Sequence, residues 1–295
     1  MSIDRVTGNY SNRSRVPKKW SDYMIATYYS DFVVPRITNT DYEGDFQGVG
    51  DTVVIPKRTK VTSRAYKVGE ELIVQDDLID ESVVMSIDYG DYFAVGIDDL
   101  DVVMQEGDEA KEIFDEGTRS LGETLEKRIL QSVYTSATST VTNSDLSGSP
   151  ALDSSNALKF FLLASMKLTQ LGVPMEDRVA VIDPITAYFL NLSDLKAAYI
   201  TADGGTPLRT GIAVEKPVGG FQVYISNYLN ATASLSHLIF AHKDAISFAA
   251  KVNTLETVRR EKHFGDLLRG LAVYGYKALQ PDGIVHGNIT SFGSF

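Results

Sequence analysis

Cysteine is absent from the 295 residues of this sequence. Its absence excludes a disulfide framework, a thiolate zinc site and a cysteine nucleophile, and it fits a reducing compartment. The sequence also lacks any run of about eighteen apolar residues, and no apolar segment follows the basic residues near its start. We therefore expect neither a membrane-spanning helix nor a secretory signal.

Motifs that mark phosphate-binding loops, dinucleotide folds, zinc proteases and serine hydrolases are missing as well. The segment Gly204-Gly205-Thr206 follows no predicted strand-to-helix turn, so a surface loop is favoured over an anion site. His237 and His242 are expected on opposite faces of one strand, and His263 and His286 stand alone. Spacing does not exclude a Ser-His-Asp triad, but no serine is marked as activated. We expect no catalytic residue, no cofactor and no metal site.

The charge is acidic overall and unevenly distributed. The net charge is −11, from 28 Lys and Arg against 39 Asp and Glu, which opposes sequence-specific binding of nucleic acid. Residues 1–20 hold five Lys or Arg and one Asp, whereas residues 98–116 hold nine acids and one Lys. A basic end and an acidic middle favour contact between copies of the chain, although both could instead be solvated faces.

The first third of the chain is predicted to contain two extended segments. Residues 1–45 hold many aromatic rings without helical periodicity, so they are predicted to form an arm that docks on this chain or on a neighbour. Residues 46–97 are predicted to form a long charged β excursion. Its strands are expected at 52–55, ended by Pro56, and at 82–87 and 92–97, which are joined by Asp88–Asp91. So little apolar content cannot form a core of its own.

A single long helix is predicted at about 108–134. Apolar or small residues recur there at steps of four: Ile113, Gly117, Leu121, Leu125, Ile129 and Val133. Such a helix would span on the order of 40 Å. Acids in its first turns and Lys127-Arg128 near its end suit the helix dipole, which is favoured over a metal-binding or catalytic carboxylate cluster.

The second half is predicted to mix helices and strands. Residues 135–152 are rich in Ser, Thr and Gly and indicate a linker at a domain boundary, after which Asp153 is expected to cap a helix at 154–171. Asp183-Pro184 is expected to open a helix at 185–192. Strands are expected at 178–182, 212–214, 221–225, 255–260 and 267–278, the last two joined by a turn at Gly265-Asp266.

The order of these segments and several local strings resemble the major capsid proteins of tailed bacteriophages. The strings include Trp20-Ser21, Asp41–Gly44, Gly50–Ile55, Val179–Pro184 with Tyr188 and Leu190, Gly211–Val214, Gly220–Asn227, Ala245–Ala249, Phe264–Asp266, Gly275–Lys277 and Pro281–Ile284. The resemblance covers most of the chain. It implies an α+β, HK97-like capsid fold.

The resemblance also implies a division of the chain. The expected parts are an N-terminal arm at 1–45, an extended β-hairpin loop at 46–97, a peripheral domain with a long spine helix at 98–150, an axial domain at 151–250, and a return to the peripheral domain at 251–295.

By the same resemblance, copies of the chain would form the pentamers and hexamers of an icosahedral head that encloses double-stranded DNA without sequence-specific binding. The head would be assembled in the bacterial cytoplasm, with no membrane and with a portal as a further partner. The expected contacts between subunits are Trp20, Tyr28, Lys57, Arg58, Lys60, Arg64, Lys67, Asp108, Glu109 and Glu112. Two alternatives remain: an encapsulin-like nanocompartment with a protein cargo, and a monomeric ligand-binding or hydrolytic α/β enzyme.

Two features of the resembling family are not matched here. Some members begin with a long scaffolding segment that a protease removes, whereas this sequence reaches its arm within twenty residues, so we expect a separate scaffolding protein unless processing has already occurred. Some members also join a loop lysine covalently to an asparagine of a neighbour. Lys57, Lys60, Lys67 and Asn288 cannot be aligned with that pattern, so we expect no cross-links.

Overall fold

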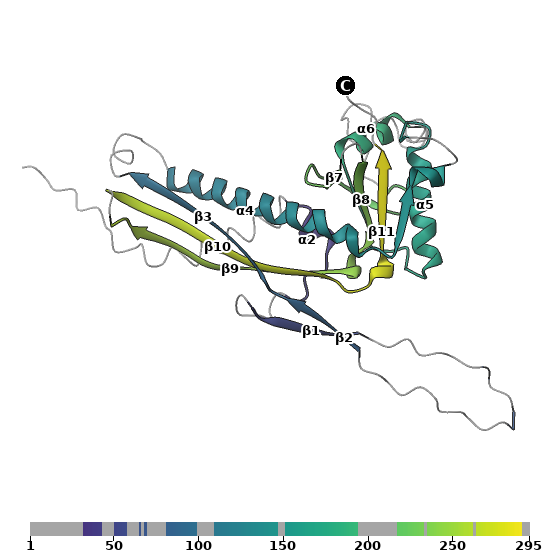
Figure 1. Ribbon diagram of the computed structural model, residues 1–295, viewed down its shortest axis with the longest axis horizontal. Helices are drawn as coiled ribbons and strands as arrows, with labels where there is room; N and C mark the ends of the chain where they lie inside the picture. Colours follow the sequence, from purple (N-terminus) through teal and green to yellow (C-terminus); the bar gives the residue numbers. More distant parts are fainter. Residues whose placement is uncertain are drawn as a thin grey trace, which may run out of the picture.

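The computed structural model in Figure 1 describes residues 32–42, 50–57, 65, 68–69, 81–98, 109–146, 151–193, 217–232, 235–261 and 264–290. These residues form an elongated part, made of a long sheet and a long helix, and a compact part built around a second sheet (Figure 1). A two-stranded ribbon leaves the long sheet. Among the described residues, no helix combines the length and apolarity needed to cross a membrane.

The elongated part contains a three-stranded antiparallel sheet of order β3-β10-β9. Its strands are β3 (Tyr89–Asp98), β10 (Gly265–Ala278) and β9 (Ile246–Arg259). Helix α4 (Glu109–Val133) has 25 residues and runs along the sheet. The predicted long helix is thus confirmed, and its step of four is buried at Leu121, Leu125, Ile129 and Val133.

The ribbon pairs β1 (Thr52–Lys57) with β2 (Glu81–Ser86) in antiparallel register. The sequence predicted that residues 88–91 join two strands. In the structure, β3 begins at Tyr89, so this connection is shorter, and β3 pairs with β10. Gly275 of β10 makes the close crossing possible, because a Cβ atom there would lie 2.5 Å from the carbonyl oxygen of Ser86. Pro56 does not end β1, since a strand with one unpaired edge tolerates a missing N–H group.

The compact part contains a mixed sheet of order β4-β11-β8-β5-β6, with a short strand β7 beside β8. Its strands are β4 (Ser139–Thr142), β11 (Ile284–Thr290), β8 (Leu235–His242), β5 (Arg178–Ile182), β6 (Gln222–Ile225) and β7 (Ala231–Thr232). Helix α5 (Ala157–Gln170) packs against it, and α6 (Pro184–Leu192) follows β5. The ring of Phe240 lies 5.1–5.6 Å from those of Phe160, Phe161 and Phe221, at the centre of the core.

Short helical segments complete the fold: α2 (Val34–Ile37), η2 (Tyr134–Ser136), η3 (Asn143–Leu146), η4 (Lys243–Ala245) and η5 (Pro281–Gly283). The predicted strand at 178–182 is confirmed, as is the cap of α6, where the Asp183 carboxylate accepts a hydrogen bond from the Thr186 amide at 3.0 Å. The mixed α and β composition expected from the sequence is therefore present.

Three local predictions were wrong in detail. The presumed linker at 135–152 contains β4, which pairs with β11 because Val141 is apolar enough to be buried there. Helix α5 begins at Ala157 because Asp153 accepts hydrogen bonds from the amides of Ser155 and Asn156 and so forms a turn before the helix. Gly265 and Asp266 belong to β10, paired with Asp98 and Ile97 of β3. The predicted strand at 212–214 lies outside the described residues.

Candidate assembly interface

Of the ten predicted contact residues, three lie in described elements. Lys57 is exposed at the end of β1, and Glu109 and Glu112 belong to the first turn of α4. The other seven lie outside the described residues: Trp20, Tyr28, Arg58, Lys60, Arg64, Lys67 and Asp108. The charged loop lies between the end of β1 at Lys57 and the start of β2 at Glu81, and both of these strands are described.

The ribbon has one buried and one exposed apolar face. Val53, Ile55 and Met85 point inward and pack against Ile87, Ala249 and Val273 at the base of the long sheet.

Val54 and Val84 are register partners on the other face, and they remain 60% and 46% exposed. Directly opposed apolar side chains in an antiparallel pair form one continuous contact surface. The outer face of the ribbon is therefore apolar at Val54 and Val84, and no described residue of the same chain buries it.

The outer end of the ribbon and the start of α4 lie far apart. The ribbon ends at the register pair of Lys57 and Glu81, on the side of the molecule that faces away from the first turn of α4 (Figure 1). At about 1.5 Å per residue, the 25 residues of α4 alone span roughly 37 Å. Within one chain, the ribbon end does not approach the acidic start of α4.

The last part of the N-terminal arm, residues 32–42, is anchored on α4, so this part docks on its own chain, which is one of the two alternatives that the sequence left open. The Phe32 ring fills the space left by Gly122, where a Cβ atom would lie 2.2 Å from the ring. The Glu126 carboxylate accepts hydrogen bonds from the Val33 amide at 3.2 Å and from the Ser226 hydroxyl at 2.9 Å. The available signal was a second glycine, Gly122, inside the predicted helix but outside its apolar stripe, because a glycine leaves room for a large ring.

Glu126 is a buried carboxylate with 2% exposure. Burial raises the pKa of Glu126 above its ordinary value, and the hydrogen bonds from Ser226 and Val33 only partly oppose this shift. Beyond α2, Asn39 pairs with β9: its amide donates to the Ile246 carbonyl at 2.8 Å, and its carbonyl accepts from Phe248 at 2.9 Å. The segment is thus fixed at both of its ends.

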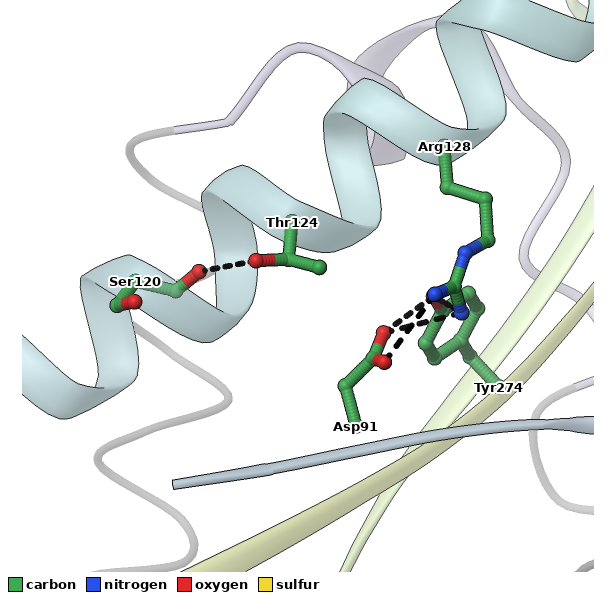
Figure 2. Close-up of polar contacts among 5 residues, drawn as sticks. All are labelled: Asp91, Ser120, Thr124, Arg128 and Tyr274. Atoms are coloured by element: carbon green, nitrogen blue, oxygen red, sulfur yellow. Dashed lines mark hydrogen bonds and ion pairs between the residues drawn. The ribbon is translucent and has the colours of Figure 1, made fainter. Parts of the chain in front are cut away.

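A polar cluster holds α4 on the long sheet (Figure 2). Both terminal nitrogens of Arg128 donate to the Asp91 carboxylate, at 3.2 and 3.3 Å. The Tyr274 hydroxyl donates to the same carboxylate at 2.6 Å. The guanidinium also lies 5.2 Å from the centre of the Tyr89 ring, where a cation–π contact is favourable. Figure 2 also shows Thr124 bonded to the carbonyl of Ser120 on the exposed side of the helix.

The tyrosines of this cluster remain protonated. Burial, followed by the bond to Asp91, raises the pKa of Tyr274, and the hydrogen bond with Tyr276 is the main cause that raises the pKa of Tyr89. Ser132 donates to the Tyr276 hydroxyl at 2.8 Å one turn further along α4. Helix and sheet are therefore joined by polar contacts over two turns, as well as by apolar packing.

The histidine prediction needs one correction. His286 does not stand alone, because β8 and β11 are neighbours and place its ring beside that of His237, with 2.8 Å between Nε2 and Nδ1. His263 lies outside the described residues. Within the described ranges, no three His, Cys, Asp or Glu side chains lie close enough together to hold a metal ion.

The family of the chain follows from a sequence comparison. A family described as phage capsid protein matches residues 80–287, which is more than half of the chain. The chain belongs to this phage capsid protein family. No curated protein matches the sequence.

Solved structures show the same capsid fold. A chain of Mycobacterium phage Che8 is 26% identical, with a TM-score of 0.71 over 86% of this chain and 90% of that chain. The capsid of Ralstonia phage GP4 is 12% identical, with a TM-score of 0.64 over 88% and 87%. A virus-like particle from Pyrococcus furiosus is 11% identical, with a TM-score of 0.55 over 92% and 98%.

The phage capsid family and the fold confirm the resemblance inferred from the sequence. The chain is a phage major capsid protein with an HK97-like fold, a structural protein of an icosahedral shell. Its place is the virion capsid, and copies of the same chain are its partners in that shell. An encapsulin-like compartment is the less supported alternative.

Proposed function

We propose that copies of this capsid protein bridge one another through the N-terminal arm and the charged loop beyond β1, and that the resulting pentamers and hexamers enclose double-stranded DNA. One observation carries the proposal: the ribbon end at Lys57 and the acidic start of α4 lie far apart within the chain (Figure 1). Attraction between the loop bases and the helix acids therefore acts between copies.

The arm, the loop, the peripheral and the axial domain would keep the boundaries expected from the sequence, except that β3 belongs to the long sheet and that β4 and β11 belong to the sheet of the compact part. A separate scaffolding protein and a portal would assist assembly in the bacterial cytoplasm. With a net charge of −11, the shell would confine DNA without binding it tightly. The subunit would catalyse no reaction of its own.

Charge reversal tests the contact between copies. In one variant, loop bases Lys57, Arg58, Lys60, Arg64 and Lys67 are changed to Glu; in a second, Asp108, Glu109 and Glu112 are changed to Lys. Each exposed pair contributes only about 0–1 kcal/mol, but a closed shell repeats each pair many times. We expect each variant alone to give no shells by size-exclusion chromatography and negative-stain imaging, and co-expression of the two to restore them.

Arg119→Glu is the matched control, because Arg119 is exposed on α4 and pairs within its own helix with Glu123 at 3.4 Å. This variant should assemble normally. Normal particles from the loop variant alone would contradict the proposal, as would failure of co-expression to restore any particles. The contents of purified particles decide the remaining alternative, since DNA supports a phage head and an enclosed enzyme supports a nanocompartment.

A further inference from the structure

A cluster of two histidines and one tyrosine lies where α4 meets the sheet of the compact part. Nδ1 of His237 on β8 lies 2.8 Å from Nε2 of His286 on β11. The ring of Tyr134, directly after α4, stacks on His237 with a centroid distance of 4.5 Å and contacts His286 at 4.8 Å with a tilt of 36°. The Tyr134 hydroxyl accepts a hydrogen bond from the Asn230 side chain at 2.7 Å. This cluster joins the elongated and compact parts through side chains.

The cluster lies on the face of the sheet opposite α5. Gly287, the neighbour of His286, faces α5, since a Cβ atom on it would lie 2.9 Å from the Phe160 ring. Because side chains alternate along a strand, His286 points to the other face. His237 is 8% exposed, so its ring is shielded from water, whereas His286 is half-buried.

The hydrogen bond between the two rings depends on their protonation. One ring nitrogen must donate and the other must accept, which a neutral pair and a singly protonated pair both allow. A doubly protonated pair instead places two donors and two positive charges 2.8 Å apart. The second proton therefore converts an attractive contact into a repulsive one.

Four uncharged polar groups lie around the pair: the Tyr134 hydroxyl from η2, the Asn230 amide before β7, and the register neighbours Thr140 on β4 and Asn288 on β11. Burial, followed by the charge of His237, lowers the pKa of His286 to about 4, and burial lowers the pKa of His237. A carboxylate is not among the causes of either shift.

We propose that the His237–His286 pair is a proton-sensitive contact, which holds the end of α4 on the compact sheet while at most one proton is bound and releases it when both rings are charged. The released group is Tyr134, because its ring contacts both imidazoles. Release would loosen the connection between the elongated and compact parts without unfolding either core.

The direction of the pH effect follows from linkage. The pKa of His286 in the folded chain, about 4, lies below the ordinary value of 6.5, so protons favour the open state as pH falls between these values. The full difference between these two pKa values would correspond to a factor of about 300 in the opening equilibrium. We expect about tenfold or more, because His286 is only half-buried and solvent screens part of the repulsion.

Hydrogen exchange of the full-length chain tests the proposal. Protection of residues 131–138 is measured by mass spectrometry at about pH 7.5 and about pH 4, after normalisation to the intrinsic exchange rate at each pH. His286→Gln and His237→Asn place amide nitrogens where Nε2 and Nδ1 lie and cannot take up a proton in this range. His242→Gln is the control, because His242 lies at the end of the same strand and bonds to the Asp244 amide instead.

The wild type and His242→Gln should lose about tenfold or more of their protection at acid pH, whereas His286→Gln and His237→Asn should lose less than about threefold. Equal acid losses in wild type and both pair variants would overturn the proposal. The wild type provides a second test that needs no variant. If its residues 131–138 lose no more protection at acid pH than residues 117–126 of the same helix, the proposal is wrong.

Discussion

Replacing Gly122 with alanine should release residues 32–39, the last part of the N-terminal arm, from helix α4. The added Cβ atom would lie 2.2 and 2.3 Å from two carbons of the Phe32 ring, distances that no real contact sustains. The helix backbone is fixed by its neighbours, so the ring must leave its place. Gly122→Ala therefore acts on Phe32 and not on the fold of α4.

The magnitude follows from the burial of the ring. Phe32 is 6% exposed, and transfer of a buried phenylalanine side chain to water costs about 2–3 kcal/mol. The higher helix propensity of alanine does not change this value, because α4 is helical whether the segment is attached or detached. The attached state therefore loses up to about 2–3 kcal/mol, which corresponds to a rise of up to about 30–150-fold in the open population.

Hydrogen exchange of residues 32–39 measures this opening directly. Thr124→Ala is the control on the same helix, because Thr124 is exposed and bonds only locally to the Ser120 carbonyl (Figure 2). Phe32→Ala should accelerate exchange strongly in the wild type but little in the Gly122→Ala background, since the ring is already displaced there. Unchanged exchange in Gly122→Ala, or additive effects in the double variant, would refute the packing argument.

Two further predictions concern charged groups on α4. Arg128→Met and Asp91→Asn should each destabilise the chain by about 1–2 kcal/mol in denaturant unfolding. The coupling between the two substitutions should be about 1 kcal/mol, because the ion pair is bidentate but partly exposed. Strictly additive losses would contradict this coupling. The raised pKa of Glu126 means that its contribution to stability is complete below the unfolded value of 4.5 and is lost as pH rises through the folded value. Glu126→Gln should therefore show a smaller fall in melting temperature between about pH 4.5 and about pH 7.5 than the wild type, and an equal fall would contradict the assignment.

Local patterns predicted the elements of this fold well where one physical cause dominates. The step of four from Gly117 to Val133 predicted α4, and Asp183 with Pro184 predicted the start of α6. In each case a short stretch of sequence contains the whole cause, either an apolar stripe or a cap.

Strand pairing was predicted less well because the partners are distant in sequence. β3 lies close to β2 along the chain, yet it pairs with β10, about 175 residues away. Residues 88–91 lie between β2 and β3 in the sequence, so they give no information about which distant strand pairs with β3. The same limit hid the contact between His237 and His286, whose strands are neighbours only in the folded sheet.

The residues that anchor the N-terminal segment show what a single apolar stripe leaves out. Gly117 packs on Phe93 of the long sheet, whereas Gly122 packs on Phe32, and five residues turn a helix by roughly 140°. Arg128 bonds to the sheet, and Glu126 bonds to the N-terminal segment. A helix with a tightly packed glycine and a bonded charge on each of two sides must contact two bodies. The charges in α4 near its end therefore do more than match the helix dipole, because they hold the helix between the long sheet and the end of the arm.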